Sequence, residues 1–203
     1  LTIGFARRAT AYKRADLIIS DLERLIKIGD GRLQILYAGK AHPKDDTGKK
    51  LIENIFLMKE RLKDKINMTY LQNYDMGIAL KMVSGVDVWL NTPLRPREAS
   101  GTSGMKAAHN GVMNFSVLDG WWIEGHIEGY TGWSIGPNPT ETTLTDNMDT
   151  LDADDLYNKL EKIIIPMYYE DRCTWIRMMQ NAIGKNAYYF NSHRMMRLYV
   201  TQA

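Results

Sequence analysis

The stretch that decides the fold is residues 1–38, LTIGFARRATAYKRADLIISDLERLIKIGDGRLQILYA. Two short apolar runs in it, Leu1–Phe5 and Leu33–Ala38, have the length and residue types of buried β-strands. Between them, Arg14–Ile28 places apolar residues near helical spacing, and Gly29-Asp30-Gly31 signals a turn. A strand, a helix and a second strand in this order predict a βαβ unit with parallel strands.

The same alternation continues to residue 118. We expect further strands at Ile66–Tyr70, Val86–Leu90 and Val112–Leu118, and helices at Leu51–Leu62, at Asp75–Met82 and from about Thr102–Gly104 onward. Strands that alternate with helices are typical of a parallel sheet covered on both faces. The sequence therefore predicts an α/β fold with a Rossmann-like, doubly wound parallel sheet.

The remainder of the chain has a different character. Asp119–Pro139 is rich in Gly, Trp and Pro and is expected to form a long ordered loop that buries its large aromatic side chains. These are Trp121, Trp122, Tyr130 and Trp133. Thr140–Asp155 is polar and acidic, which indicates a surface segment leading into a helix. Further helices are expected at Leu156–Met167, Asp171–Ile183 and Asn186–Val200.

Composition excludes several classes of function. With 44% hydrophobic and 25% charged residues, the 203-residue chain is globular and not disordered. The formal charge of +2 gives no support to a nucleic-acid partner, and without a run of about 18 apolar residues we expect no membrane span. One cysteine, Cys173, excludes an internal disulfide framework. The four histidines are scattered, and Asp152, Asp154 and Asp155 do not fit a calcium loop, so no metal site is expected. These three carboxylates are expected to favour the N-terminus of the next helix.

The stretch Arg95–Gly111, RPREASGTSGMKAAHNG, carries the strongest chemical signal. It follows a predicted strand, and Thr102 and Ser103 are candidate N-cap residues of the next helix. Free N–H groups and the positive dipole end at a helix N-terminus form an anion site, with Lys106 in the first helical turn. The alternative is an ordinary strand-to-helix turn with an exposed lysine.

A basic cluster follows the first predicted strand, with Arg7 and Arg8 at its start. The carboxyl ends of parallel strands share one edge of the sheet, where ligands bind. Arg7 and Arg8 are therefore expected on the same edge as Lys40 and the Ser100–Lys106 loop. Each of these cations taken alone is usually a solvated surface charge, but together they indicate a phosphorylated ligand.

Several segments together resemble a known family. GFARRATAYKR, AGKAHP, NYDMGIA, GVDVWLN and EASGTSGMKAAHNGVMNFSVLDG are similar, in consistent order over about residues 1–136, to the C-terminal lobe of the α-glucan phosphorylases. The resemblance implies two Rossmann-like lobes in the glycosyltransferase B arrangement, with the active site between them. It implies release of glucose 1-phosphate from the non-reducing ends of an α-1,4-glucan by inorganic phosphate, with retention of configuration. It also implies pyridoxal 5'-phosphate, linked to the lysine that Lys106 matches.

The resemblance implies roles for individual residues. Arg8 and Lys13 match contacts to the substrate phosphate, and these two with Lys106 are the expected catalytic residues. Glu98, Ser100 and Gly101 match contacts to the hydroxyls of the transferred glucose. The expected cofactor-binding residues are Lys106, Thr102, the backbone of Ser103, Arg7 near the cofactor phosphate, and Tyr74 packing beside the cofactor. Without the resemblance, Tyr74 is equally well explained as a core aromatic residue.

The sequence also departs from the well-known animal and plant members. Thr10 and Ala11 stand where those enzymes have a histidine and a glutamate, and Asp75 replaces an arginine. Together with the divergent segment WWIEGHIEGYTGW at residues 121–133, these changes are typical of a bacterial or archaeal branch.

We interpret residues 1–203 as a single C-terminal cofactor-binding lobe that ends in a helical segment at about 152–200. The N-terminal lobe of the same chain is the expected partner, a homodimer stays open, and the piece alone is expected to be inactive. The basic, aromatic last helix is interpreted as a docking surface between lobes. A cysteine-poor, nearly neutral composition is compatible with the cytoplasm. The alternatives are a lobe of a nucleotide-sugar glycosyltransferase of the glycogen or starch synthase type, or a non-catalytic module that binds a phosphorylated ligand.

Overall fold

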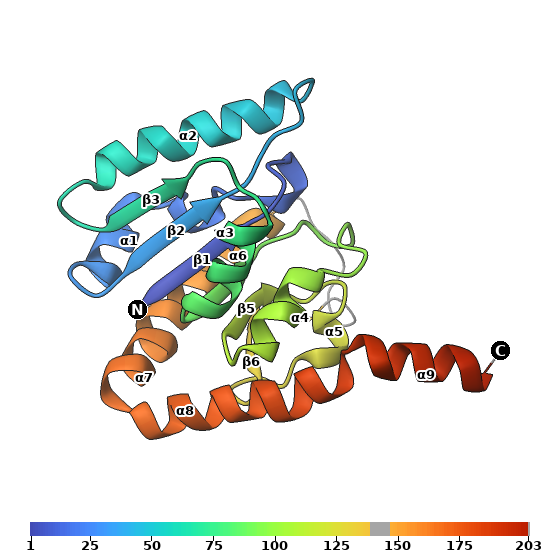
Figure 1. The fold of residues 1–203 in the computed structure, drawn as a ribbon. Coiled ribbons are helices and arrows are strands. Elements are labelled where there is room, and N and C mark those ends of the chain that lie inside the picture. The colour runs from blue at the N-terminus through green and yellow to red at the C-terminus, as the bar shows by residue number, and fades with distance from the viewer. Residues whose placement is uncertain (139–146, 203) are drawn as a thin grey trace.

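A six-stranded, entirely parallel sheet forms the centre of the computed structural model, which describes residues 1–138 and 147–202 (Figure 1). The strand order is β3-β2-β1-β4-β5-β6. The strands are β1 (Thr2–Ala6), β2 (Gln34–Ala38), β3 (Asn67–Leu71), β4 (Val88–Asn91), β5 (Met113–Val117) and β6 (Gly132–Ile135). This architecture confirms the predicted α/β, Rossmann-like fold, and five of the six strands lie where the sequence predicts them.

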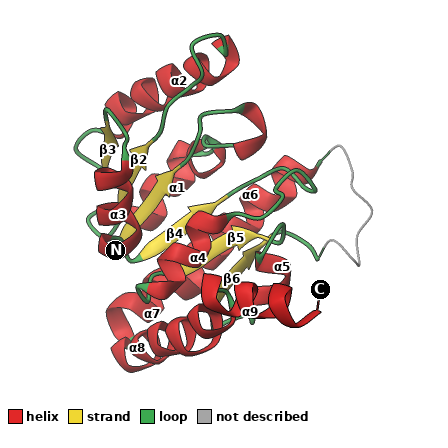
Figure 2. Ribbon diagram, turned by 45° about the vertical axis from the view of Figure 1, so that its right-hand side comes forward, coloured by secondary structure: helices red, strands yellow, loops and turns green. Residues whose placement is uncertain are grey.

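Helices cover both faces of the sheet (Figure 2). They are α1 (Leu22–Gly29), α2 (Asp46–Leu62), α3 (Met76–Gly85), α4 (Thr102–His109), α5 (Trp122–Gly125), α6 (Met148–Lys159), α7 (Ile165–Glu170), α8 (Arg172–Asn181) and α9 (Ser192–Gln202). Two short 3₁₀ helices follow β1, η1 (Ala11–Lys13) and η2 (Leu17–Ile19), and two π-helical segments, η3 (Leu160–Ile164) and η4 (Ala182–Ala187), extend α6 and α8.

Successive side chains of each strand point to opposite faces of the sheet, where they belong to two separate hydrophobic cores. On one face, Ile3 and Phe5 of β1 pack with Leu25 of α1, Ile55 of α2 and Leu156 of α6. On the other face, Ala6 and Trp89 pack with Met82 and Val83 of α3 and with Ala107 of α4. Strands of the sheet centre are buried on both faces, as is usual for parallel strands between helix layers, although β5 includes the polar Asn114 and Ser116 and the edge strand β3 has exposed Asn67 and Thr69.

The helix predicted at Arg14–Ile28 is shorter than the sequence indicated. Arg14 adopts a left-handed backbone conformation with φ of 46°, which ends η1 and prevents a helix from passing through it. The α-helix begins only after Asp21, whose carboxylate accepts the backbone N–H of Arg24 at 2.9 Å as an N-cap.

The Gly- and Trp-rich segment is not simply a long loop, because it contains α5 and the edge strand β6. Trp121, Trp122 and Trp133 are buried, as predicted, whereas Tyr130 is 39% exposed, so its predicted burial is wrong. At Gly132 a side chain would collide with the carbonyl oxygen of Asn114 on β5. This strand can therefore pair closely only because the position is glycine.

A polar cluster fixes the end of β6. The Glu128 carboxylate accepts hydrogen bonds from the backbone N–H and the hydroxyl of Ser134, each at 2.9 Å, and lies 2.6 Å from Nε2 of His126. Burial alone pushes the pKa of Glu128 up, but these hydrogen bonds and the charge of Lys159 together lower it to about 2.

The C-terminal helices differ from the prediction in their boundaries. The helix at Leu156–Met167 is part of a longer run from Met148 to Glu170, in which Pro166 lies in the first turn of α7 after the π-helical segment. In a π-turn the backbone hydrogen bonds span five residues and close a wider ring than in an α-helix. This wider turn accommodates the proline. The last helix starts at Ser192, not at Asn186, and Figure 1 shows it extending away from the sheet.

The polar segment predicted at Thr140–Asp155 is a surface segment only in part. Its residues 140–146 lie outside the described part of the chain. The helix into which it leads begins at Met148, and Asp152 in its second turn is completely buried. The expectation that Asp152 serves the N-terminus of a later helix is therefore wrong, and its true partners are two buried arginines.

Candidate functional site

The loops after β1 and β4 meet at the carboxyl edge of the sheet, because β1 and β4 are paired neighbours. The strand order reverses at this pair, and the following helices α1 and α4 cover opposite faces. Ligands of open parallel sheets bind in the crevice at such a switch point. The residues predicted to bind phosphate follow β1, and the predicted sugar and cofactor residues Glu98 to Lys106 follow β4.

Main-chain contacts extend the pairing of β1 and β2 into the first loop. The N–H of Arg7 donates to the carbonyl of Ala38 at 3.2 Å. At Gly39, where φ is +157°, any side chain would collide with the carbonyl oxygen of Arg7, so only glycine allows this approach. The exposed side chain of Arg8 is therefore attached to a backbone that is fixed on one side by β2.

Arg7, Lys13 and Glu98 form one charged cluster across the two loops. Nη1 of Arg7 donates to Oε2 of Glu98 at 3.0 Å, and the ammonium of Lys13 donates to the same oxygen. The side chains of Arg7, Lys13 and Glu98 are only 6%, 10% and 12% exposed. Burial lowers the pKa of Arg7, and the Glu98 carboxylate opposes that shift. Two cations and one carboxylate carry a net positive charge, which suits an anionic ligand.

Asp119, two residues after the end of β5, holds the Glu98 loop in place. Its Oδ2 accepts the backbone N–H of Glu98 at 2.8 Å, and its Oδ1 accepts the N–H of Gly120 at 2.9 Å. The carbonyl of Ser100 accepts the N–H of Trp121 at 2.8 Å. Our sequence reasoning assigned no role to Asp119. Its position directly after a buried strand, at the same edge as the other candidates, was the available signal.

The helix α4 begins without a side-chain cap. Gly101 in a left-handed conformation is the N-cap residue, so the prediction that Thr102 or Ser103 caps the helix is wrong. The hydroxyl of Ser103 instead accepts a hydrogen bond from Nε1 of Trp89 at 3.2 Å. The N–H of Gly104 donates to the carbonyl of Gly101 at 3.1 Å, and no side chain caps the N–H groups that precede it, an arrangement that can bind an anion.

Thr102 and Lys106 lie one turn apart on the exposed side of α4, opposite the buried Gly104 and Ala107. A hydroxyl and backbone N–H groups are donors that can bind an anion, and the primary amine of Lys106 lies within one helical turn of them. Such a pair on a buried face could not reach a ligand.

Two further predicted residues, Tyr74 and Lys40, differ in how deeply they are buried. Tyr74 is half-buried and packs on the hydrophobic core under α3 and α4. Burial raises the pKa of Tyr74, and the nearby charge of Arg7 opposes the shift. Lys40 is exposed, and its carbonyl accepts the N–H of Ala9 at 3.1 Å. Lys40 therefore lies at the predicted edge.

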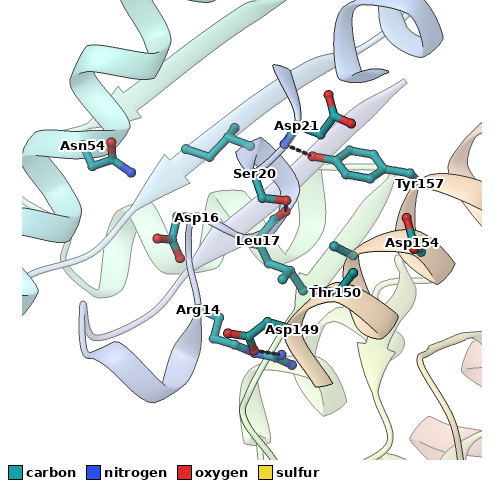
Figure 3. A pocket seen from close by; sticks show the side chains of 12 residues that line it. Arg14, Asp16, Leu17, Ser20, Asp21, Asn54, Asp149, Thr150, Asp154 and Tyr157 are labelled. Atoms are coloured by element: carbon teal, nitrogen blue, oxygen red, sulfur yellow. Dashed lines mark hydrogen bonds and ion pairs between the residues drawn. The ribbon is translucent and has the colours of Figure 1, made fainter. Parts of the chain in front are cut away.

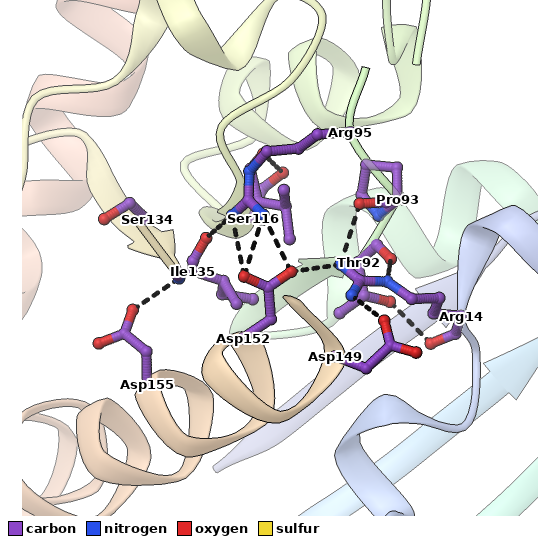
Figure 4. Close-up of polar contacts among 12 residues, drawn as sticks. Arg14, Thr92, Pro93, Arg95, Ser116, Ser134, Ile135, Asp149, Asp152 and Asp155 are labelled. Atoms are coloured by element: carbon purple, nitrogen blue, oxygen red, sulfur yellow. Dashed lines mark hydrogen bonds and ion pairs between the residues drawn. The ribbon is translucent and has the colours of Figure 1, made fainter. Parts of the chain in front are cut away.

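A second cluster of charged residues is buried around Asp152 (Figure 4). Asp152 of α6 accepts hydrogen bonds from Nη2 of Arg14 at 2.6 Å and from both terminal nitrogens of Arg95 at 3.0 to 3.1 Å. Its side chain is 0% exposed, and those of Arg14 and Arg95 are 7% and 3% exposed. We call Asp152, Arg14 and Arg95 the Asp152 cluster.

Comparison with known proteins identifies the family. The family model described as carbohydrate phosphorylase matches residues 7–130, which include every predicted site residue. The chain belongs to this family. It is 50% identical over 203 residues to maltodextrin phosphorylase of Thermococcus litoralis, and 47% identical over 210 residues to glycogen phosphorylase of Aquifex aeolicus. It is also 40% identical to glycogen phosphorylase of Mycobacterium tuberculosis over 208 residues.

These matches confirm the resemblance to the phosphorylases, and they extend it beyond residue 136. They cover 98% or more of this chain but only 24% to 30% of each relative. The chain thus spans about a quarter to just under a third of the length of these phosphorylases. An uncharacterized protein of Methanocaldococcus jannaschii, MJ1631, is also 34% identical over 203 residues.

A surface cavity of about 540 Å3 lies apart from the phosphorylase candidates (Figure 3). It is enclosed by the segment after η1, by α2 and by α6, and Asp16, Asp21, Asn54 and Asp154 line it. It shares Arg14 with the Asp152 cluster, but its lining contains none of the residues predicted for the site. In residues 1–138 and 147–202, no group of three or more His, Cys, Asp or Glu residues is placed to hold a metal ion. No helix of this part of the chain is long and apolar enough to cross a membrane.

Proposed function

We propose that this chain is the cofactor-binding lobe of a retaining α-1,4-glucan phosphorylase, which releases glucose 1-phosphate from glucan non-reducing ends by using inorganic phosphate. The family match over residues 7–130 carries this proposal. The cluster of Arg7, Lys13 and Glu98 at the switch point supports it, because that is where the bound phosphate and sugar would meet.

In this proposal, the cations bind and neutralise phosphate. Arg8 and Lys13 hold inorganic phosphate, and their charges stabilise it beside the terminal glucosyl ring. That ring develops positive charge as its bond to the shortened glucan, the leaving group, breaks and its bond to phosphate forms. Without ligand, Lys13 is engaged by Glu98. Incoming phosphate competes for Lys13, and this leaves Glu98 to accept hydrogen bonds from sugar hydroxyls beside Ser100 and Gly101.

The start of α4 is the proposed site of pyridoxal 5'-phosphate. Lys106 is its covalent anchor, Thr102 and the backbone of Ser103 hold its phosphate, Arg7 contributes charge, and Tyr74 packs beside it. The cofactor, when bound, supplies a phosphate group that can exchange a proton with the substrate phosphate. Uncapped N–H groups and nearby cations are the donors that two adjacent phosphates require.

The rest of the protein is proposed to complete the site. Because the chain spans at most about a third of its phosphorylase relatives, we infer that a second lobe of the same protein closes the cleft and supplies further glucan contacts. Residues 1–203 alone are then inactive. We also propose that the enzyme acts in the cytoplasm, in accord with the single cysteine among these 203 residues.

The test is phosphorolysis by the natural full-length protein. Incubated with maltodextrin, it is expected to release glucose 1-phosphate only when inorganic phosphate is present, and Lys106→Ala is expected to abolish the release. Lys65→Ala, on a surface loop at the opposite edge of the sheet, is the matched control and should retain activity. Glucan extension from a nucleotide sugar, without phosphate dependence, would instead establish the glycosyltransferase alternative.

A further inference from the structure

Two loops from distant parts of the sequence carry the proposed phosphate and sugar contacts, and backbone contacts hold them together. The N–H of Leu94 donates to the carbonyl of Tyr12 at 2.7 Å. The hydroxyl of Thr92 lies 2.9 Å from the carbonyl oxygens of both Lys13 and Arg14 and shares its proton between them. The backbone that carries Lys13 is therefore attached directly to the segment that leads to Glu98.

The side chain of Arg14 strengthens this attachment. Its Nε donates to the carbonyl of Thr92 at 2.9 Å and its Nη2 to the carbonyl of Pro93 at 3.0 Å. The same Nη2 also donates to Oδ2 of Asp152 at 2.6 Å, while Nη1 reaches Asp149 at 2.7 Å. A guanidinium with all its nitrogens engaged is fixed in orientation, which fixes the neighbouring Lys13 as well.

Arg95 connects the second loop to the same carboxylate. Both of its terminal nitrogens donate to Asp152, and Nη2 also donates to the carbonyl of Ile135 at 2.6 Å. Arg95 is three residues before Glu98 in the chain. At Gly136 a side chain would collide with Oδ1 of Asp152, so the end of β6 can approach the carboxylate only because it is glycine.

We propose that Asp152 is a positioning residue for the phosphorylase reaction, an inference that rests on the proposed function. One buried carboxylate on α6 holds Arg14 beside Lys13 and Arg95 near Glu98, so it sets the distance between the phosphate cation and the sugar carboxylate. Figure 4 shows both arginines reaching the Asp152 carboxylate, Arg95 from above and Arg14 from the right. A merely structural ion pair would not have to join the two loops that carry the reacting groups.

The test is Asp152→Asn in the full-length protein, which keeps the shape of the side chain and removes its charge. We expect the KM for inorganic phosphate to rise about tenfold to a hundredfold, because small displacements of positioning groups have effects of that size. The matched control is Asp154→Asn on the same helix, whose 62% exposed carboxylate pairs with Arg24. It should change this KM by less than about twofold.

The outcomes separate the two proposals. If Asp152 has only a structural role, Asp152→Asn lowers the amount of active enzyme, and hence the apparent kcat, but leaves the KM for phosphate unchanged. That result overturns the inference. A wild-type protein without any phosphorolysis overturns the proposed function and this inference with it.

If Asp152→Asn does not fold, Thr92→Val decides the question. This variant removes the hydroxyl that ties the Lys13 backbone to the second loop and leaves no buried charge unpaired. We expect it to raise the KM for phosphate about two- to tenfold, the effect of one hydrogen bond. An unchanged KM in a folded Thr92→Val protein contradicts the positioning role.

Discussion

Replacement of Asp152 by alanine should strongly reduce the free energy of unfolding. The carboxylate is 0% exposed and takes four hydrogen bonds from Arg14 and Arg95. Alanine leaves the guanidinium of Arg95, itself 3% exposed, buried without a carboxylate partner. Removal of one partner of a buried ion pair costs about 3–5 kcal/mol. At about 2–4 °C per kcal/mol for a domain of this size, the melting temperature should fall by about 6–20 °C.

Thermal unfolding followed by circular dichroism measures this effect. Asp154→Ala is the control, because its exposed carboxylate on the same helix forms a surface ion pair with Arg24 at 3.1 Å. Such pairs contribute at most about 1 kcal/mol, so the control should melt within about 4 °C of the wild type. Equal melting temperatures for Asp152→Ala and Asp154→Ala would refute the reasoning that Asp152 neutralises two buried cations.

Three further predictions concern other parts of the fold and the site. Gly104→Ala should destabilise the protein by about 1–3 kcal/mol in urea unfolding, because the added methyl group would lie 2.8 Å from Nε1 of Trp121; no change would mean that α4 can shift. Glu128→Gln should destabilise the protein at pH 7. The pKa of Glu128 is about 2 in the folded state and near 4.3 in the unfolded state, so the destabilisation should shrink as the pH falls from about 5 to 2. A destabilisation that does not change with pH contradicts this. Arg8→Ala should raise the KM for phosphate about ten- to 150-fold, which corresponds to the free energy of one charged hydrogen bond. Lys40→Ala should raise this KM less. Equal effects of the two variants contradict the assignment of Arg8.

The sheet was predictable because its signal is local. Each of the first five strands is a short segment of mainly apolar residues, interrupted by single polar residues in β3 and β5, so the pattern of the local sequence is sufficient to find it. The edge strand β6 was missed because its four residues, GWSI, lie among glycines and tryptophans and include no long apolar run. The helix start at Leu22 was missed because apolar spacing continues through Leu17 and Ile18, which form a 3₁₀ turn instead.

The site was predictable only in part, because some of its residues have no signal in the local sequence. Motif similarity indicated Arg7, Lys13 and Glu98, and the structure brings these three together. Nothing local distinguishes Asp152 from the exposed Asp154 two residues later. The partners of Asp152 are Arg95, 57 residues away, and Arg14, 138 residues away, so only the folded chain reveals its role.

Covalent trapping of the cofactor tests the central claim most directly. The full-length protein is incubated with pyridoxal 5'-phosphate, reduced with borohydride and digested, and the pyridoxyl adduct is located by mass spectrometry. We predict one selective adduct on Lys106, absent from Lys106→Arg. A selective adduct on another lysine, or none at all, would contradict the assignment of the start of α4 as the cofactor site.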